Sequence, residues 1–120
     1  MKLTCDRAKL VAAAQAAAEV APARPARPIA QGVLFDVKRD KVHLVATDFD
    51  LRLTYTLECK KVEGEGQAVV SAAMLLAVVR DLTGDTVELD METEVSVLRC
   101  GGSRVSLPGF PAGEFPAGAD

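Results

Sequence analysis

Residues 31–58, QGVLFDVKRDKVHLVATDFDLRLTYTLE, contain three apolar runs separated by short polar turns. The runs cover residues 31–38, 41–47 and 51–58, and each has the length and composition of a β-strand. In the third run the apolar residues Leu51, Leu53, Tyr55 and Leu57 alternate with Arg52, Thr54, Thr56 and Glu58. Because successive side chains of a strand point to opposite faces, this period predicts a sheet with one buried face and one wet face.

A strand and a helix are expected before this stretch. Residues 2–5 are predicted as a short strand, Asp6 as the N-cap, and residues 7–21 as a helix that ends at Pro22. On the helical wheel Leu10, Ala14, Ala17 and Ala21 form one stripe flanked by Val11 and Ala18, and Gln15 and Glu19 lie opposite. So small an apolar stripe lets the helix lie close to a sheet. The proline-rich residues 21–28, APARPARP, are an extended loop because proline fixes φ.

The same order of elements repeats in the second half of the chain. The charged residues 60–66 are predicted as a loop, residues 67–70 as a strand, and Ser71 as the N-cap of a helix ending near residue 82. Its apolar stripe is Leu75, Val78, Val79 and Leu82, with Ala73, Ala77 and Arg80 opposite. Three strands follow at residues 86–90, 95–100 and 103–107. Two β-α-β-β-β units therefore predict an α+β fold with antiparallel sheet and both helices on one side.

Composition restricts the class of protein. A chain of 120 residues with 49% apolar residues is expected to be one domain with one core. Aromatic residues make up 4%, which disfavours a nucleic-acid site built on stacked rings. The apolar runs are too short to span a membrane, and the opening residues contain no targeting signal, so a cytoplasmic location is expected.

The cysteines predict neither a disulfide framework nor a zinc site. Cys5, Cys59 and Cys100 are odd in number and widely spaced along the chain. The simplest expectation is three reduced thiols and no bound metal or cofactor.

No constellation of residues indicates an enzyme. The Asp48-Phe49-Asp50 segment resembles the Asp-x-Asp-x-Thr motif of phosphate-transferring hydrolases, but Arg52 stands in place of the threonine. Asp residues that form a turn explain the segment equally well. His43 is the sole histidine and lies within a predicted strand, so neither a catalytic triad nor a histidine metal cluster can be assembled.

Basic residues are concentrated in the first part of the chain. Residues 1–42 contain eight Lys and Arg against four Asp and Glu, whereas the formal net charge of the whole chain is −3. This asymmetry suggests one face that meets an anion. Arg24 and Arg27 on the proline-rich loop, Arg7 and Lys9 on the first helix, and Arg80 on the second could contact phosphate without regard to base sequence.

Four segments in the right order resemble the N-terminal domain of the bacterial DNA polymerase III beta subunit, the replicative sliding clamp. They are MKLTCDRAKL (1–10), ARPARPIAQGVLF (23–35), VHLVATDFDLRL (42–53) and GGSRVSLPGFPAGEFP (101–116). The resemblance covers the whole chain and implies the DNA-clamp fold. In that family the complete subunit joins three such domains and pairs head to tail into a ring. Residues 1–120 are therefore expected to be the first of three domains, and the chain a fragment of a longer one.

The resemblance also implies partners and sites. The helices would face duplex DNA, with Arg24, Arg7, Arg80 and Arg27 as sequence-independent contacts. Residues Ser103, Arg104, Val105, Ser106 and Leu107 match the strand that pairs with the second subunit, with Val105 and Leu107 at its apolar contact positions. Ala73 and Met74 stand where relatives often carry basic residues, so a weaker DNA contact is expected. The polymerase and the clamp loader would bind later domains.

A different class of function remains open at the level of sequence. A free-standing α+β interaction module, or the regulatory domain of a larger enzyme, would have the same composition and element order. Two further duplicated units downstream of this domain would confirm the clamp, and their absence would favour the interaction module.

Overall fold

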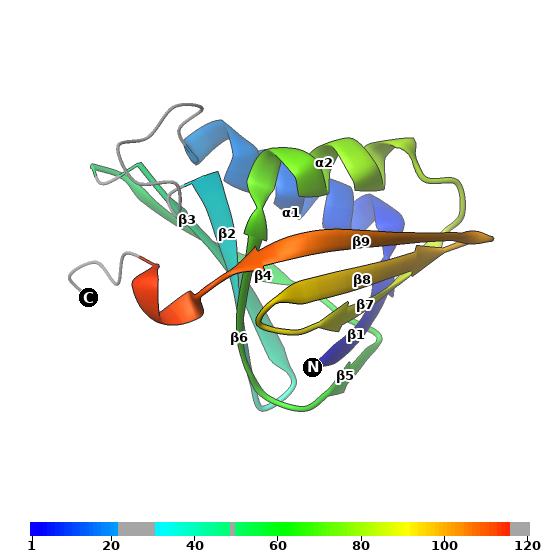
Figure 1. Ribbon diagram of the computed structural model, residues 1–120. Coiled ribbons are helices and arrows are strands. Elements are labelled where there is room, and N and C mark those ends of the chain that lie inside the picture. The colour runs from blue at the N-terminus through cyan, green and yellow to red at the C-terminus, as the bar shows by residue number, and fades with distance from the viewer. Residues whose placement is uncertain (22–30, 49, 116–120) are drawn as a thin grey trace.

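The computed structural model describes residues 1–21, 31–48 and 50–115, which form an antiparallel sheet with two helices on one face (Figure 1). The elements are β1 (Lys2–Asp6), α1 (Arg7–Val20), β2 (Gly32–Lys38), β3 (Lys41–Thr47), β4 (Arg52–Leu57), β5 (Lys61–Glu63), β6 (Gly66–Ser71), α2 (Ala72–Asp81), β7 (Thr86–Met91), β8 (Val95–Cys100), β9 (Ser103–Phe110) and the 3-10 helix η2 (Ala112–Glu114). The prediction of a loop over residues 60–66 was wrong in part. β5 lies there and pairs with β1, with Leu3 opposite Val62, because an exposed strand edge accepts even a short segment with alternating polarity.

The two β-α-β-β-β units exchange their first strands. The sheet order is β4-β3-β2-β6-β9-β8-β7-β1-β5. β1 of the first unit pairs with β7 of the second, and β6 of the second unit pairs with β2 of the first. Each unit thus completes the sheet of the other, and this explains how two short units share one core. The predicted α+β fold, with antiparallel sheet and both helices on one side, is confirmed.

The helices α1 and α2 lie side by side over the core (Figure 1). Their buried residues are Leu10, Ala13, Ala14 and Ala17 on α1 and Ala72, Leu75 and Val79 on α2. The sheet contributes larger side chains beneath them, among them Phe35, Leu44 and Leu89. Both predicted stripes are confirmed in their central residues. Ala13 widens the stripe of α1, and Ala21 is only partly buried.

The two helices begin differently, although both N-caps were predicted. The Ser71 hydroxyl accepts a hydrogen bond from the Met74 backbone N–H at 3.2 Å, as expected for a cap. Asp6 makes no side-chain cap. Its carboxylate lies 2.9 Å from Lys60 Nζ instead. Asp6 does occupy the predicted N-cap position, but its carboxylate forms an ion pair with a residue distant in sequence instead of a capping hydrogen bond.

A second, smaller apolar cluster lies on the sheet face away from the helices. Leu34, Val45 and Val69 meet there across three strands, and Phe115 covers them with 6% of its surface exposed. Phe110 and Ala112 pack around the same cluster. The segment after β9 is thus anchored to the sheet through one aromatic side chain.

Candidate nucleic-acid face and open strand edge

The exposed residues of the helix pair include two basic and two acidic side chains. Its exposed residues are Ala8, Lys9, Ala12, Gln15 and Glu19 on α1 and Ala73, Met74, Ala77, Arg80 and Asp81 on α2. Met74 is a large apolar side chain, and 44% of its surface is exposed. The expectation of reduced basic charge at Ala73 and Met74 thus concerns two side chains that do face solvent.

Arg80 is the available cation of this surface in the part of the chain that the structure describes. It is exposed in the last turn of α2 and forms no hydrogen bond or ion pair with the described residues. A cation at a helix C-terminus interacts favourably with the helix dipole. Because the Arg80 guanidinium group has no partner among the described residues, it can reach an anion. Arg24 and Arg27, two further candidate cations, lie outside the described residues.

Arg7 is bound within the fold. Its Nε donates to the carbonyl oxygen of Gly84 at 2.8 Å, and its Nη1 donates to the carbonyl oxygen of Val79 at 3.2 Å. Its backbone N–H also donates to the carbonyl of Asp85 at 2.7 Å. These bonds tie the start of α1 to the end of α2. The sequence suggested a phosphate contact for Arg7, and the structure adds a structural role that uses two of its guanidinium donors.

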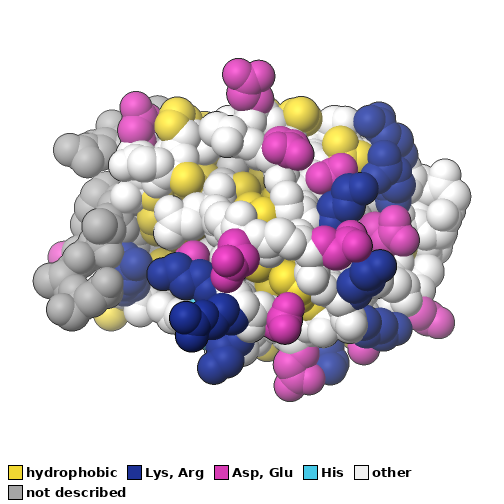
Figure 2. All heavy atoms as spheres, turned by 90° about the horizontal axis from the view of Figure 1, so that it is seen from below, with side chains coloured by type: hydrophobic (Ala, Val, Ile, Leu, Met, Phe, Trp, Pro, Cys, Tyr) yellow, Lys and Arg dark blue, Asp and Glu magenta, His cyan; other side chains and the backbone are white. Residues whose placement is uncertain are grey.

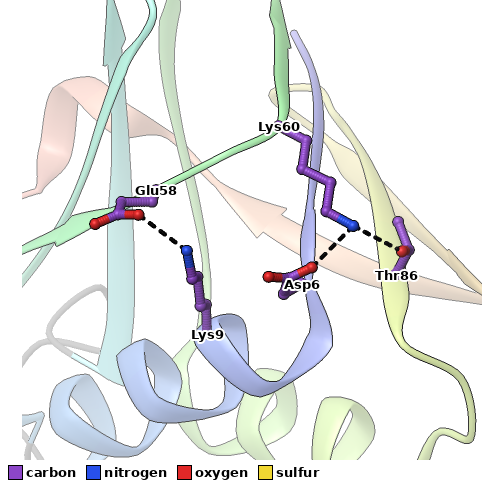
Figure 3. Close-up of polar contacts among 5 residues, drawn as sticks. All are labelled: Asp6, Lys9, Glu58, Lys60 and Thr86. Carbon is purple, nitrogen blue, oxygen red and sulfur yellow. Dashed lines mark hydrogen bonds and ion pairs between the residues drawn. The ribbon is translucent and has the colours of Figure 1, made fainter.

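Lys9 and Lys60 belong to a polar cluster that sequence analysis did not find (Figure 3). Lys9 Nζ lies 2.9 Å from Glu58 Oε2, and Lys60 Nζ lies 2.9 Å from Asp6 Oδ1 and 3.4 Å from the Thr86 hydroxyl. Lys60 lowers the pKa of the Asp6 carboxyl, and Lys9 lowers that of Glu58. The cluster joins α1, β1 and β7 to the connection between β4 and β5. The positive charge of Lys9 is balanced by Glu58.

The face away from the helices has a different character. Viewed from that side, positive and negative side chains are interspersed around apolar ones (Figure 2). On β7, β8 and β9, Glu88 pairs across the strands with Arg99, and Arg99 pairs with Arg104. The outermost of these, Arg104, thus faces a like charge and has no acidic cross-strand neighbour on its own sheet.

One edge of β9 is open. Residues 103–108 pair with β8, whereas pairing with β6 is confined to Gly109 and Phe110. The Gly101-Gly102 turn closes the hairpin at Cys100 and Ser103, and the Gly109 N–H donates to the Glu94 carbonyl at 2.8 Å. In an antiparallel ladder such bonds recur at every second residue. The N–H groups of Arg104 and Ser106 therefore point away from β8 toward the open edge.

The candidate interface side chains divide between the two faces of β9. Ser103, Arg104 and Ser106 are exposed, and Val105 is half-buried against the core. The side chain of Leu107 is 1% exposed and packs inside the chain's own core. The expectation of Leu107 as an apolar contact position therefore needs correction, because at this residue mainly backbone remains for a partner.

The residues that resembled catalytic groups have structural partners. Asp48 Oδ1 accepts hydrogen bonds from the backbone N–H groups of Asp50 at 2.9 Å and Leu51 at 2.6 Å. These bonds lower the pKa of the Asp48 carboxyl and form the turn expected for it. His43 Nδ1 lies 3.2 Å from the Thr56 hydroxyl on the neighbouring strand.

A duplicated β-α-β-β-β unit, with two helices on one face and an open edge at its last strand, defines a domain of the DNA sliding clamp class. The family model for the "DNA polymerase III beta subunit, N-terminal domain" matches residues 1–118. The chain belongs to this family. Among the described residues, neither helix is long and apolar enough to cross a membrane.

Named relatives and solved structures agree with this family. The chain is 33% identical to the beta sliding clamp of Caulobacter vibrioides, in a match that covers 97% of this chain. It is 31% identical to the beta sliding clamp of Streptomyces coelicolor, in a match that covers 98% of this chain. It spans about a third of the length of both relatives (32% and 31%). The structure superposes on the DNA polymerase III beta subunit of Pseudomonas aeruginosa with a TM-score of 0.93 and 26% identity, covering 100% of this chain and 33% of that one.

Proposed function

We propose that this chain is the first of three domains in the subunit of a ring-shaped, non-catalytic sliding clamp. The ring encircles duplex DNA and confers processivity on the replicative polymerase. The observation that carries the proposal is the family match over residues 1–118 together with the length of the relatives. Their remaining two-thirds leave room for two more domains of this size.

The helix pair is proposed as the DNA-facing surface of the ring. Its contacts would be to phosphates, from Arg80 on α2 and from Arg24 and Arg27 on the loop after α1. Phosphate contacts carry no sequence information, which suits a protein that must pass every sequence. The scarcity of other cations on this surface fits a clamp held by topology, since many phosphate contacts would slow its sliding.

The open edge of β9 is proposed as the contact with a second subunit in a head-to-tail homodimer. A strand from the partner would accept hydrogen bonds from the N–H groups of Arg104 and Ser106 and extend the sheet. Arg104 lacks an acidic cross-strand neighbour in its own sheet, so an acidic side chain on the partner strand would complement it. Val105 would add apolar contact through its exposed half.

Other partners are proposed from the family. The replicative polymerase and the clamp loader would bind the later domains of the subunit, and no cofactor or metal is required for encirclement. A protein that acts on the bacterial chromosome is expected in the cytoplasm.

The decisive test separates topological from electrostatic binding. The full-length subunit that contains this domain is loaded onto a nicked circular plasmid by a clamp loader and washed in salt high enough to break phosphate contacts. We expect the protein to stay on circular DNA and to leave when the plasmid is cut once. Equal retention on circular and linear DNA, or equal loss from both, would contradict the clamp and favour an interaction module.

A further inference from the structure

Two cysteines that are distant in sequence meet at the edge of the core. Cys5 lies in β1 with 0% of its surface exposed. Cys59 lies in the connection between β4 and β5 and packs half-buried against the same core. The Lys60 N–H donates to the Thr4 carbonyl at 2.7 Å, and β5 continues the pairing along β1. The backbones on both sides of the pair are therefore held together.

The two thiols are close enough to influence each other's ionisation, and the effect is unequal. The interaction raises the pKa of Cys5 and lowers that of Cys59. Burial raises the pKa of Cys5 further, and Asp6 and Lys60 act on it in opposite directions. Cys59 is thus the more acidic and more accessible thiol, and these are the properties of an attacking sulfur.

We propose that Cys5 and Cys59 form a thiol–disulfide site that closes in the presence of a hydroperoxide. The Cys59 thiolate attacks the peroxide, the O–O bond breaks, and Cys59 becomes a sulfenic acid while hydroxide leaves and takes a proton to become water. The Cys5 sulfur then attacks Cys59, the S–O bond breaks, and the Cys5 proton leaves with the oxygen as a second water. Two thiols give two electrons to one peroxide and end as one disulfide.

The local backbone permits this bond. Cys59 lies outside any strand, between Leu57 at the end of β4 and Lys61 at the start of β5. A change of its side-chain rotamer therefore breaks no strand pairing, and the Lys60–Thr4 bond holds the backbone beside it against β1 at 2.7 Å.

The third cysteine provides a control. Cys100 is 2% exposed, its thiol donates to the Thr83 carbonyl at 3.6 Å, and Val87 on β7 stands between it and Cys5. It should neither join nor compete with the Cys5–Cys59 pair.

A disulfide here would connect β1 to the connection between β4 and β5. The first strand of the first unit would then be joined covalently to the connection that follows its last strand, at the point where Lys9–Glu58 and Lys60–Asp6 link the same region electrostatically. Crosslinks that close long loops destabilise the unfolded chain most, so thermal stability should rise.

The test treats the reduced chain with hydrogen peroxide and compares wild type, Cys59→Ala and Cys100→Ala. In wild type, the number of free thiols per chain, titrated in denaturant, should fall from three to one on oxidation. Intact mass should drop by about 2 Da, and a non-reduced digest should yield one peptide pair joining residues 5 and 59. Cys100→Ala should show the same loss of mass and Cys59→Ala should not. The wild-type Tm should rise by at least about 5 °C on oxidation and return with reductant.

Three results would overturn the site. The first is a gain of about 16 or 32 Da on Cys59 with Cys5 still free, which would mean that the two sulfurs do not meet. The second is a dimer linked between chains through Cys59. The third is a disulfide that survives in Cys59→Ala, which would place the reactive pair elsewhere.

Discussion

Arg7 Nη1 donates to the carbonyl oxygen of Val79 at 3.2 Å, so the first turn of α1 holds the last turn of α2. A carbonyl in the last turn of a helix lacks an intrahelical donor. The arginine supplies one and places its positive charge at the negative end of the α2 dipole. The two helices proposed to face DNA are therefore fixed relative to each other by a residue that sequence analysis had assigned to DNA.

Arg7→Ala should destabilise the fold by about 1–2 kcal/mol, because two hydrogen bonds from a half-exposed charged group are lost. Arg80→Ala is the matched control and should change the free energy of unfolding by less than about 0.5 kcal/mol. Urea unfolding of both variants measures the difference. Equal effects would show that the bonds of Arg7 contribute nothing to stability.

Arg104→Pro should weaken association of the full-length subunit at least about tenfold while the domain stays folded. It removes an N–H that points to the open edge, and proline is tolerated on strand edges. Val105→Pro is the control, since it removes an N–H directed at β8 and should cost about 3 kcal/mol or more of stability. Sedimentation velocity and thermal melting separate the two effects. Undiminished self-association of a folded Arg104→Pro protein would place the interface elsewhere.

Binding of short DNA by this domain should be weak and insensitive to base sequence. With about three arginines near phosphates, the slope of log affinity against log salt should be no steeper than about −3, and the Kd at physiological salt should be about 10⁻⁴ M or weaker. Arg24→Ala and Arg80→Ala should each reduce the slope by about one. Fluorescence anisotropy with two unrelated duplexes tests this. Submicromolar binding or a preference between the duplexes would be inconsistent with the proposed contacts.

Acidification should remove the contribution of the ion-pair cluster. The folded-state pKa values of Asp6 and Glu58 lie below their ordinary values. The stability they contribute is therefore present above the unfolded-state pKa of about 4 and is lost as pH falls through the folded-state values. Lys9→Met should lower the urea midpoint slightly at about pH 7 and leave it unchanged at about pH 2. An undiminished difference at the acidic pH would mean that Lys9 acts through packing alone.

Phe115→Ala should release the segment after β9 from the outer sheet face. Phe115 is 6% exposed over Leu34, Val45 and Val69, and its loss should cost about 2 kcal/mol, with local opening limiting the effect. Leu51→Ala, at a side chain 64% exposed, is the control. Hydrogen exchange should rise around residues 110–115 in the first variant alone. Unchanged exchange there would show that Phe115 does not anchor the segment.

Local patterns determined the kinds of element and most of their boundaries. Short-range patterns can be recognised from the sequence, because they depend on neighbours within a few residues. They include the period-two alternation after Leu51, the apolar stripe from Leu75 to Leu82 and the Ser71 cap. The repeated element order and four family segments then indicated the clamp domain. The same local rules placed Asp6 at the N-cap but did not reveal the partner of its side chain, because Lys60 is remote in sequence.

Only the tertiary structure determined the pairings between the two halves. The exchange of β1 and β6 between units, the short strand β5 and the open edge of β9 follow from long-range strand pairing, which no local pattern encodes. Arg7 reaches the end of α2 for the same reason. Cys5 and Cys59, whose spacing argued against any disulfide, lie against the same core because β5 returns the chain to β1. Sequence spacing does not measure distance once strands from opposite ends of the chain share one sheet.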